Sequence, residues 1–284
     1  MQKPTIKKII NFPLTKIAAG LAIIFTSGLI GETIRKWLPI ATSGFGAIND
    51  LLVATIQISL SLAGYIFLFN RYEKRSVTEL SESNFISLSL TGLFLGFLIQ
   101  SFNIFVIYLR GLYEVLGVNP AAFLIPGFIT SIVAGFMAEL ALRGIFFRLI
   151  ENSLGTFISL IIISLLFGII HASGKGASFI SVWATIAQAG WLTSALFIYS
   201  RSLWLPIFFH FAWDFAEPAI FGGINPGISV DKVLLSSSIG GPAWLTGGSA
   251  GPGNSLQSAI ICSLLAVMFL WLGRKNFKRP FWSG

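Results

Sequence analysis

The chain contains two histidines, and both lie in apolar stretches of sequence that also carry acidic residues. His171 ends the stretch that begins at Phe167, and His210 is followed four residues later by Asp214, on the same face of a predicted helix. Histidine is the side chain whose charge changes most easily near neutral pH. Imidazoles with a carboxylate can also hold zinc, and zinc-bound water ionises at about pH 7. In a protected cavity, such groups would activate water and stabilise the oxyanion that forms when a peptide bond is cut.

Two further acidic residues lie in apolar sequence. Glu139 and Arg143 are spaced i,i+4, which predicts an internal ion pair on one helical face. Three roles remain open for Glu139: a carboxylate base, a metal ligand, or only the partner of Arg143. Glu217 lies seven residues after His210, and so on much the same face, but Pro218 follows it directly. We expect Glu217 to lie at the outer edge of the membrane.

The elements that must position these residues are membrane-spanning helices. Of the 284 residues, 55% are hydrophobic and 11% are charged, and the mean hydropathy is +0.82. Soluble chains usually carry about 25% charged residues. Apolar runs of ~20 residues recur, each long enough to cross a hydrocarbon core of roughly 30 Å, and they are continuous rather than alternating. The predicted fold class is therefore all-α, a polytopic helical bundle in a membrane.

Eight membrane-spanning helices are predicted, within a single transmembrane domain that covers residues 1–284. The first span is short, and an interfacial segment or an uncleaved signal anchor are alternatives for it. No repeat indicates a second domain. The predicted spans are residues 17–31, 48–69, 86–109, 122–150, 154–171, 177–199, 203–222 and 256–273.

The basic residues predict the orientation of these spans. With the N-terminus in the cytoplasm, 14 Lys and Arg residues fall on the inside and five on the outside. Cytoplasmic segments carry the excess of Lys and Arg, so both termini are predicted to be cytoplasmic. The inside set is Lys3, Lys7, Lys8, Lys16, Arg71, Lys74, Arg75, Arg143, Arg148, Arg201, Arg274, Lys275, Lys278 and Arg279, and the outside set is Arg35, Lys36, Arg110, Lys175 and Lys232.

Other features narrow the classes of function. The net charge of +8 comes from the ends of spans, where basic residues face lipid headgroups, so nucleic acid is not a predicted partner. Cys262 is the single cysteine, which excludes an intrachain disulfide or a cysteine-based metal site.

The loop 222–255 contains GGPAWLTGGSAGPGN and has two interpretations. It is either an exposed linker or a re-entrant loop over a cavity mouth, which Trp244 and Leu245 would suit.

In their order and spacing, these residues resemble the CPBP family of intramembrane metalloproteases, also called the ABI or CAAX protease-like family. Its members carry Glu-Glu-x-x-x-Arg, then Phe-x-x-x-His, then His-x-x-x-Asn/Asp. The resemblance covers residues 125–223, and the GPAWLTGG sequence also looks like bacterial members. Each motif is weak alone, but their order in successive apolar spans makes the combination specific. The matching residues are Glu139 and Arg143, then Phe167 and His171, then His210 and Asp214.

The resemblance implies an eight-helix fold, a catalytic core at about residues 122–223, and endopeptidase activity. Glu139 and His171 would activate water, and His210 with Asp214 would stabilise the oxyanion or help to hold a metal. The implied cofactor is a divalent metal, with zinc as the first choice and His171 and His210 as its ligands. The implied partners are membrane lipid and a peptide or lipid-modified protein substrate. The implied location is the plasma (inner) membrane of a bacterium, with multiple passes.

One position departs from the family pattern, because Ala138 stands where the family has its first motif Glu. In the family, that Glu is the better candidate for the water-activating base. Adjacent helical positions point about 100° apart, so Glu139 cannot simply replace it. Three explanations remain open. The chain is an enzyme that uses another carboxylate such as Glu139, a natural pseudoprotease that binds a peptide or gives bacteriocin immunity, or a variant silenced by a Glu-to-Ala substitution.

A proton-coupled transporter is the remaining alternative, since transporters also place Glu, His and Asp within their spans. Inverted repeats would be expected in such a protein, and the sequence shows none.

Overall fold

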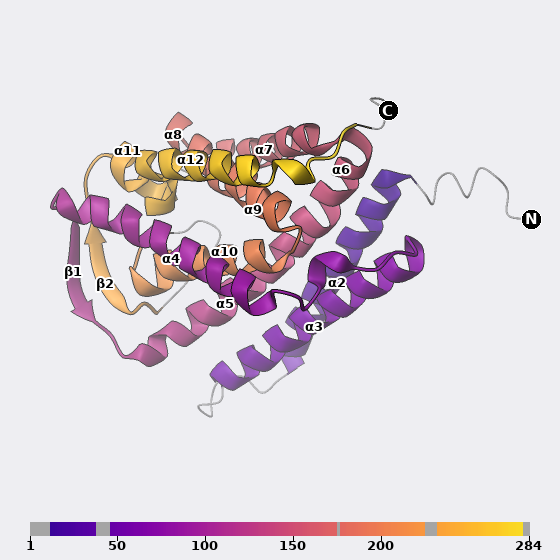
Figure 1. Ribbon diagram of the computed structural model, residues 1–284. Helices are drawn as coiled ribbons and strands as arrows, with labels where there is room; N and C mark the ends of the chain where they lie inside the picture. The colour runs from indigo at the N-terminus through magenta and orange to yellow at the C-terminus, as the bar shows by residue number, and fades with distance from the viewer. Residues whose placement is uncertain (1–11, 38–45, 175–176, 225–231, 281–284) are drawn as a thin grey trace, which may run out of the picture.

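The computed structural model describes residues 12–37, 46–174, 177–224 and 232–280. Its helices pack side by side into a bundle, with a two-stranded ribbon at one end (Figure 1). The predicted all-α class is confirmed. In chain order the elements are α2 (Pro13–Trp37), α3 (Gly46–Tyr72), η1 (Thr78–Leu80), α4 (Phe85–Leu109), β1 (Tyr113–Val118), η2 (Ala121–Phe123), α5 (Leu124–Glu139), η3 (Leu140–Phe147), α6 (Arg148–Leu154), α7 (Thr156–Ala172), α8 (Phe179–Thr185), η4 (Ile186–Leu192), α9 (Thr193–Ser200), α10 (Trp204–Phe215), η5 (Ala216–Ile220), β2 (Leu235–Ile239), α11 (Ala243–Thr246), η6 (Gly248–Ala250), η7 (Pro252–Asn254), α12 (Leu256–Leu272) and η8 (Arg274–Asn276).

Each of the eight predicted spans overlaps a helix or a continuous run of helical segments. Five of these runs are long and apolar enough to cross a membrane, and α7 and α12 are shorter apolar helices. The first predicted span extends further than expected, because α2 has 25 residues and reaches Trp37. Its length and composition are those of a helix that crosses a membrane.

Three of the helical runs contain a π-helical segment. These segments are η3 between α5 and α6, η4 between α8 and α9, and η5 at the end of α10. A π-helical segment interrupts the regular hydrogen-bond ladder, and such segments are found frequently at functional sites. Two of them lie close to predicted site residues in the sequence, because η3 directly follows Glu139 and η5 begins two residues after Asp214.

Helix α10, which carries two of the predicted site residues, packs very closely against α4 and α5. Gly92 and Gly96 form a Gly-x-x-x-Gly pattern on α4, and a Cβ at Gly96 would lie 2.7 Å from the carbonyl oxygen of Phe209. A Cβ at Gly135 on α5 would lie 3.0 Å from the carbonyl oxygen of Ile207. In membranes, small residues allow helix backbones to approach each other in this way. The glycines therefore determine how deep α10 lies between its neighbours.

Strands β1 and β2 form an antiparallel ribbon, although both fall in segments expected to be loops. The ribbon pairs Tyr113 with Ile239 at one end and Val118 with Leu235 at the other. The hydroxyl of Tyr113 donates a hydrogen bond of 2.9 Å to the carbonyl of Phe221, directly after η5. The ribbon thus fixes the chain that leaves the site-bearing helix.

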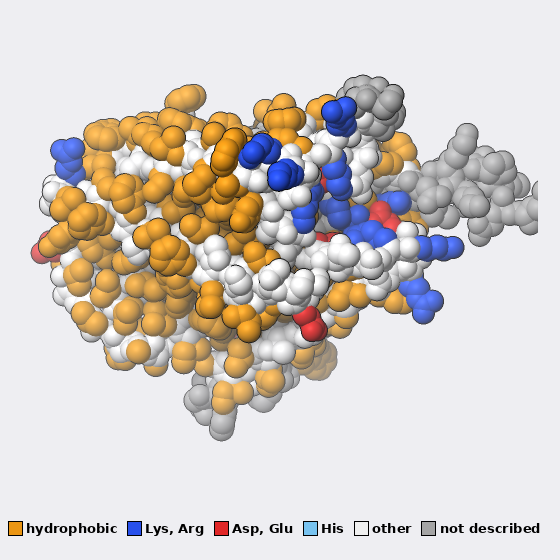
Figure 2. Space-filling view, in the orientation of Figure 1, with side chains coloured by type: hydrophobic (Ala, Val, Ile, Leu, Met, Phe, Trp, Pro, Cys, Tyr) orange, Lys and Arg blue, Asp and Glu red, His pale blue; other side chains and the backbone are white. Residues whose placement is uncertain are grey.

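Basic and acidic side chains concentrate at one end of the bundle. Figure 2 shows most of the Lys and Arg side chains of this face toward the end where α2, α3 and α6 lie. The residues predicted to lie on the inside come from five segments of the chain. Each of these segments contributes a residue to the ion pairs at this end, as the predicted topology requires. The ion pairs are Lys16–Glu73 (3.2 Å), Arg148–Glu73 (2.7 Å), Arg75–Glu79 (2.6 Å), Arg201–Glu151 (2.6 Å) and Lys278–Glu151 (3.4 Å).

The side of the membrane that this end faces stays a prediction. Arg143, which was counted among the inside residues, is fully buried within the bundle and does not belong to an inside segment. Lys3, Lys7, Lys8 and Lys175, which also entered the count, lie outside the described residues.

Candidate active site

A cavity of about 150 Å³ lies between α7, η4, α10 and η5, with the loop at Gly253 as a further wall. Three of the four predicted catalytic residues line this cavity, although they come from two helices that are far apart in the sequence. The cavity is lined by Phe167, His171, Thr185, Gln188, Ala189, His210, Trp213, Asp214, Glu217, Gly253 and Asn254.

His210 lies between two carboxylates. Its Nδ1 is 2.7 Å from Oε1 of Glu139, at the end of α5, and its Nε2 is 3.2 Å from Oδ2 of Asp214, one turn later on α10. Both ring nitrogens can donate hydrogen bonds at once only in the imidazolium form. The arrangement therefore favours a positive charge on His210 at the wall of the cavity.

Glu139 serves two partners through one oxygen. The Nη1 of the fully buried Arg143 donates to Glu139 Oε1 over 3.0 Å, so the predicted ion pair is present. The Nη2 of Arg143 donates to the carbonyl of Ala189 in the π-helical segment η4. The guanidinium also lies 5.7 Å from the centre of the Phe167 ring. Since Glu139 does not line the cavity, its carboxylate acts there through His210.

His171 lies half-buried at the end of α7. Its Nδ1 is 3.2 Å from the carbonyl oxygen of Phe167, one turn earlier on the same helix. When Nδ1 donates its proton to that carbonyl, Nε2 is left as a hydrogen-bond acceptor. The Phe and the His of the second motif therefore contact each other directly, and His171 contributes a basic nitrogen to the cavity wall.

Glu217 is a cavity residue, a role that the expectation of a position at the outer membrane edge did not include. The residue is only 1% exposed and lines the same cavity as His210 and Asp214. Pro218 does not end the helix there, because the run continues to Ile220 in the π-helical geometry of η5. The seven-residue spacing from His210 was the signal that pointed to a shared face.

The loop after the ribbon is not an exposed linker along its whole length. Gly251, Pro252 and Gly253 are buried, and Gly253 and Asn254 line the cavity. The side chain of Asn254 accepts a hydrogen bond of 2.7 Å from Thr185 on α8. This part of the loop re-enters the bundle, whereas residues 225–231 lie outside the described residues.

Sequence reasoning missed Thr185, Gln188 and Asn254 as cavity residues. The first two are isolated polar residues in a predicted span, and Asn254 follows the Gly-Pro-Gly of the loop. No spacing rule connects them to the histidines, because their proximity depends on how α8, η4 and the loop pack.

Ala138 lies half-buried on α5 and is not among the cavity-lining residues. Its methyl group carries no acid or base. The departure from the family motif therefore remains in the folded chain, and the carboxylates that the cavity contains are those of Asp214 and Glu217.

The described residues do not supply the ligand set of a zinc site. No group of three or more described His, Cys, Asp or Glu side chains is placed to hold a metal ion. Both ring nitrogens of His210 already contact carboxylates. Protein zinc sites use three or four side-chain ligands. Zinc held by His171 and His210 stays a prediction. The contacts of His210 with the two carboxylates do not fit it.

Residues 120–216 match a protein family described as Rce1-like, type II CAAX prenyl endopeptidase. The matched segment contains both histidines, Glu139, Arg143 and Asp214, and it ends immediately before Glu217. No curated protein and no solved structure matches the chain. The resemblance inferred from the three motifs is confirmed at the level of the family.

Proposed function

We propose that this chain, whose residues 120–216 match the Rce1-like family of type II CAAX prenyl endopeptidases, is an active endopeptidase that cuts a lipid-modified peptide. One observation carries the proposal. His171, His210 and Asp214 line a single cavity, and Glu139 contacts Nδ1 of His210, the ring nitrogen that does not contact Asp214. Hydrolysis of a peptide bond needs an oriented water and a stabilised oxyanion, and this arrangement offers groups for both.

The two histidines have different roles in this proposal. The Nε2 of His171 accepts a hydrogen bond from water and orients it in the cavity. The imidazolium of His210, held between Glu139 and Asp214, places a positive charge beside the oxyanion that forms on the scissile carbonyl. Asp214 and Glu139 keep the ring in one orientation, so no reorganisation is needed when the charge develops.

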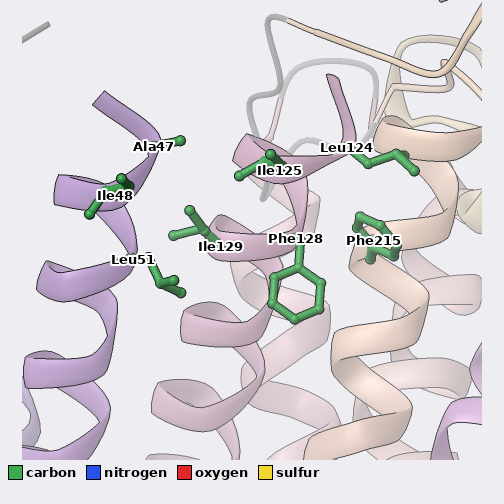
Figure 3. A pocket seen from close by; sticks show the side chains of 8 residues that line it. All are labelled: Ala47, Ile48, Leu51, Leu124, Ile125, Phe128, Ile129 and Phe215. Atoms are coloured by element: carbon green, nitrogen blue, oxygen red, sulfur yellow. The ribbon is translucent and has the colours of Figure 1, made fainter. Parts of the chain in front are cut away.

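A partly exposed apolar groove suits the lipid part of the substrate. It has a volume of about 520 Å³ and lies between α3, α5 and the end of α10. Figure 3 shows side chains from all three elements around it. Phe215, directly after Asp214, forms one wall, so α10 separates the groove from the polar cavity. The lining is wholly apolar: Ala47, Ile48, Leu51, Leu124, Ile125, Phe128, Ile129 and Phe215.

We propose that this groove holds the isoprenoid chain of the substrate. Ile48, Leu51 and Phe128 are each about half exposed on it, so a chain can enter from the surrounding lipid. An isoprenoid buried there would lower KM by holding the peptide near α10, without changing the chemical step.

The test uses purified protein in liposomes and an internally quenched peptide that ends in Cys-aliphatic-aliphatic-X, with and without a farnesyl group on the cysteine. We expect the farnesylated peptide to be cleaved with the lower KM. His171→Ala should reduce kcat by about 10²-fold or more, since removal of acid–base help commonly has that effect. Glu114→Gln, at an exposed position on β1, is the control and should cleave normally. Failure to cleave either peptide, or cleavage that His171→Ala leaves unchanged, would overturn the proposal.

Ala138 favours one alternative, a family member that binds its peptide without cutting it. In that case the farnesylated peptide would bind, as measured by fluorescence anisotropy, and would remain intact on prolonged incubation. Cleavage that depends on His171 eliminates this alternative.

A further inference from the structure

Glu217 is a buried carboxylate with unusual surroundings for this chain. In the described part of the chain, three other buried glutamates each form an ion pair with an arginine: Glu79 with Arg75, Glu139 with Arg143, and Glu151 with Arg201. Glu217 is 1% exposed and forms no ion pair with a described residue. Burial of an ionisable side chain within the spans of a membrane protein costs free energy, and side chains that bear this cost usually have a function.

Two neutral donors hold the Glu217 carboxylate in place. Gln100 Nε2 on α4 donates to Oε2 over 2.7 Å, and the backbone N–H of Gly253 donates to Oε1 over 2.8 Å. Gln100 is itself oriented, because Asn103 Nδ2 donates to its carbonyl oxygen over 3.1 Å. That bond turns the amide nitrogen of Gln100 toward Glu217. Both contacts donate to the carboxylate, and neither partner neutralises its charge.

The glycine loop fits closely around this carboxylate. A Cβ at Gly253 would lie 2.7 Å from Glu217 Oε2, and a Cβ at Gly251 would lie 2.7 Å from Oε1. Gly251 also has a φ of +84°, which side-chain-bearing residues rarely adopt. The Gly-Pro-Gly segment thus brings its backbone to a distance from the Glu217 carboxylate that only glycine allows.

The carboxylate shares the cavity with both histidines. A water molecule needs roughly 10–15 Å³ of cavity volume. The cavity of about 150 Å³ therefore has room for several water molecules. Asp214 is engaged with Nε2 of His210, and Glu139 with Arg143 and Nδ1 of His210. Glu217 is therefore the cavity carboxylate that is not already paired with a histidine or an arginine.

We propose that Glu217 is the catalytic base of this chain and replaces the acid that Ala138 lacks. The inference rests on the proposed endopeptidase function. Glu217 removes a proton from the cavity water while the water oxygen bonds to the scissile carbonyl carbon. The protonated carboxyl then gives that proton to the leaving nitrogen as the C–N bond breaks. One water is consumed, one carboxylic acid and one amine form, and no oxidant, reductant or further reactant is required.

The test compares kcat and KM for the farnesylated peptide in liposomes, with thermal unfolding as a measure of folding. Glu217→Gln should lower kcat by about 10²–10⁴-fold, with KM changed only a few-fold and a folded protein. Glu217→Asp, which keeps the carboxylate, should recover part of the rate. A residue that only holds the glycine loop would instead raise KM or lower the unfolding temperature, and Glu217→Asp would bring no recovery.

Glu151→Gln is the matched control, because Glu151 is a fully buried carboxylate remote from the cavity, in the charged end of the bundle. It should unfold at a lower temperature but cleave with a normal kcat per folded molecule. If Glu217→Gln cleaves like the wild type while His171→Ala is inactive, Glu217 is not the base and the endopeptidase function stands. If the wild type and His171→Ala are equally inactive, the proposed function fails and this inference fails with it.

Discussion

Among single residues, Glu139 is the one whose contacts limit its role most strongly. Three roles were open for it from the sequence. Its Oε1 contacts both Arg143 and His210, and it does not line the cavity. Glu139 is thus placed as a positioning residue, which orients His210 and neutralises Arg143. Its Oε2 is buried without a hydrogen-bond partner among the described residues, so the ion pair is not an ideal one.

Glu139→Gln should lower stability by about 3–5 kcal/mol, because it leaves the fully buried guanidinium of Arg143 without a counter-charge. The double variant Glu139→Gln/Arg143→Met should recover much of that loss, since no unpaired charge remains buried. Neither variant should cleave at the wild-type rate, because His210 loses its second carboxylate. Thermal unfolding and peptide cleavage measure the two effects separately. A stable double variant with full activity would show that Glu139 is only the partner of Arg143.

At the scale of elements, the site depends on the close packing of α10. Three of its residues, His210, Trp213 and Asp214, line the cavity, and the depth of the helix is determined by glycines on α4 and α5. The π-helical segments matter at the same scale. Gln188 and Ala189 lie in η4, and Glu217 lies in η5. The segments η4 and η5 thus change the phase of their helices where residues turn toward the cavity, whereas no residue of η3 lines it.

Gly96→Leu should displace α10 from α4, since even a Cβ at this position would lie 2.7 Å from both Phe209 O and the Cβ of Ala212. We expect a loss of stability of about 1–3 kcal/mol from overpacking. Cleavage should fall further than stability alone explains, because His210 and Asp214 move with the helix. Gly117→Ala is the control, as its added Cβ meets nothing within 4 Å. Wild-type kcat in a folded Gly96→Leu protein would contradict this account.

Across the whole molecule, the charged side chains are distributed unequally between the two ends of the bundle. The end formed by α2, α3 and α6 carries the ion-pair network, where Glu73 contacts both Lys16 and Arg148. These groups lie at the ends of spans, so they link helices without placing charge in the hydrocarbon. Away from this network, Gly253 and Asn254 of the re-entrant loop help to line the cavity, which no described Lys or Arg lines.

The network should make stability depend on pH. Burial works to raise the pKa of Glu73 and Glu79, but the cations around them outweigh it, so both carboxyl groups have a pKa below the usual value of 4.5. Arg148 acts on Glu73, and Arg75 acts on Glu79. For a lowered folded-state pKa, the added stability is present above about 4.5 and is lost as pH falls through the folded-state values.

We therefore expect the unfolding temperature to be constant near neutral pH and to decrease as pH falls below about 4.5, through the lowered folded-state pKa values of Glu73 and Glu79. The variant Glu73→Gln/Glu79→Gln should be less stable near neutral pH and should show a smaller decrease in acid. Unfolding in lipid nanodiscs, followed by tryptophan fluorescence, measures both proteins. An equal decrease in the two proteins would assign the acid sensitivity to other groups.

Much of the helical architecture was predictable from composition and apolar runs. Each predicted span overlaps a helical run, because a chain in lipid must satisfy its backbone hydrogen bonds within each segment. The π-helical segments and the ribbon were not predicted. Both depend on packing between segments that are distant in the sequence, which hydropathy does not report.

The sequence by itself determined the class of this protein, its helices, and the motif residues Glu139, Arg143, His171, His210 and Asp214. Their types and i,i+4 spacings are local properties of the chain. Only the tertiary structure decided that Glu139 reaches the cavity through His210, and that Glu217 lines the same cavity as both histidines. The approach of α4, the course of η5 past Pro218 and the return of the glycine loop are long-range contacts, and no spacing along a single helix encodes them.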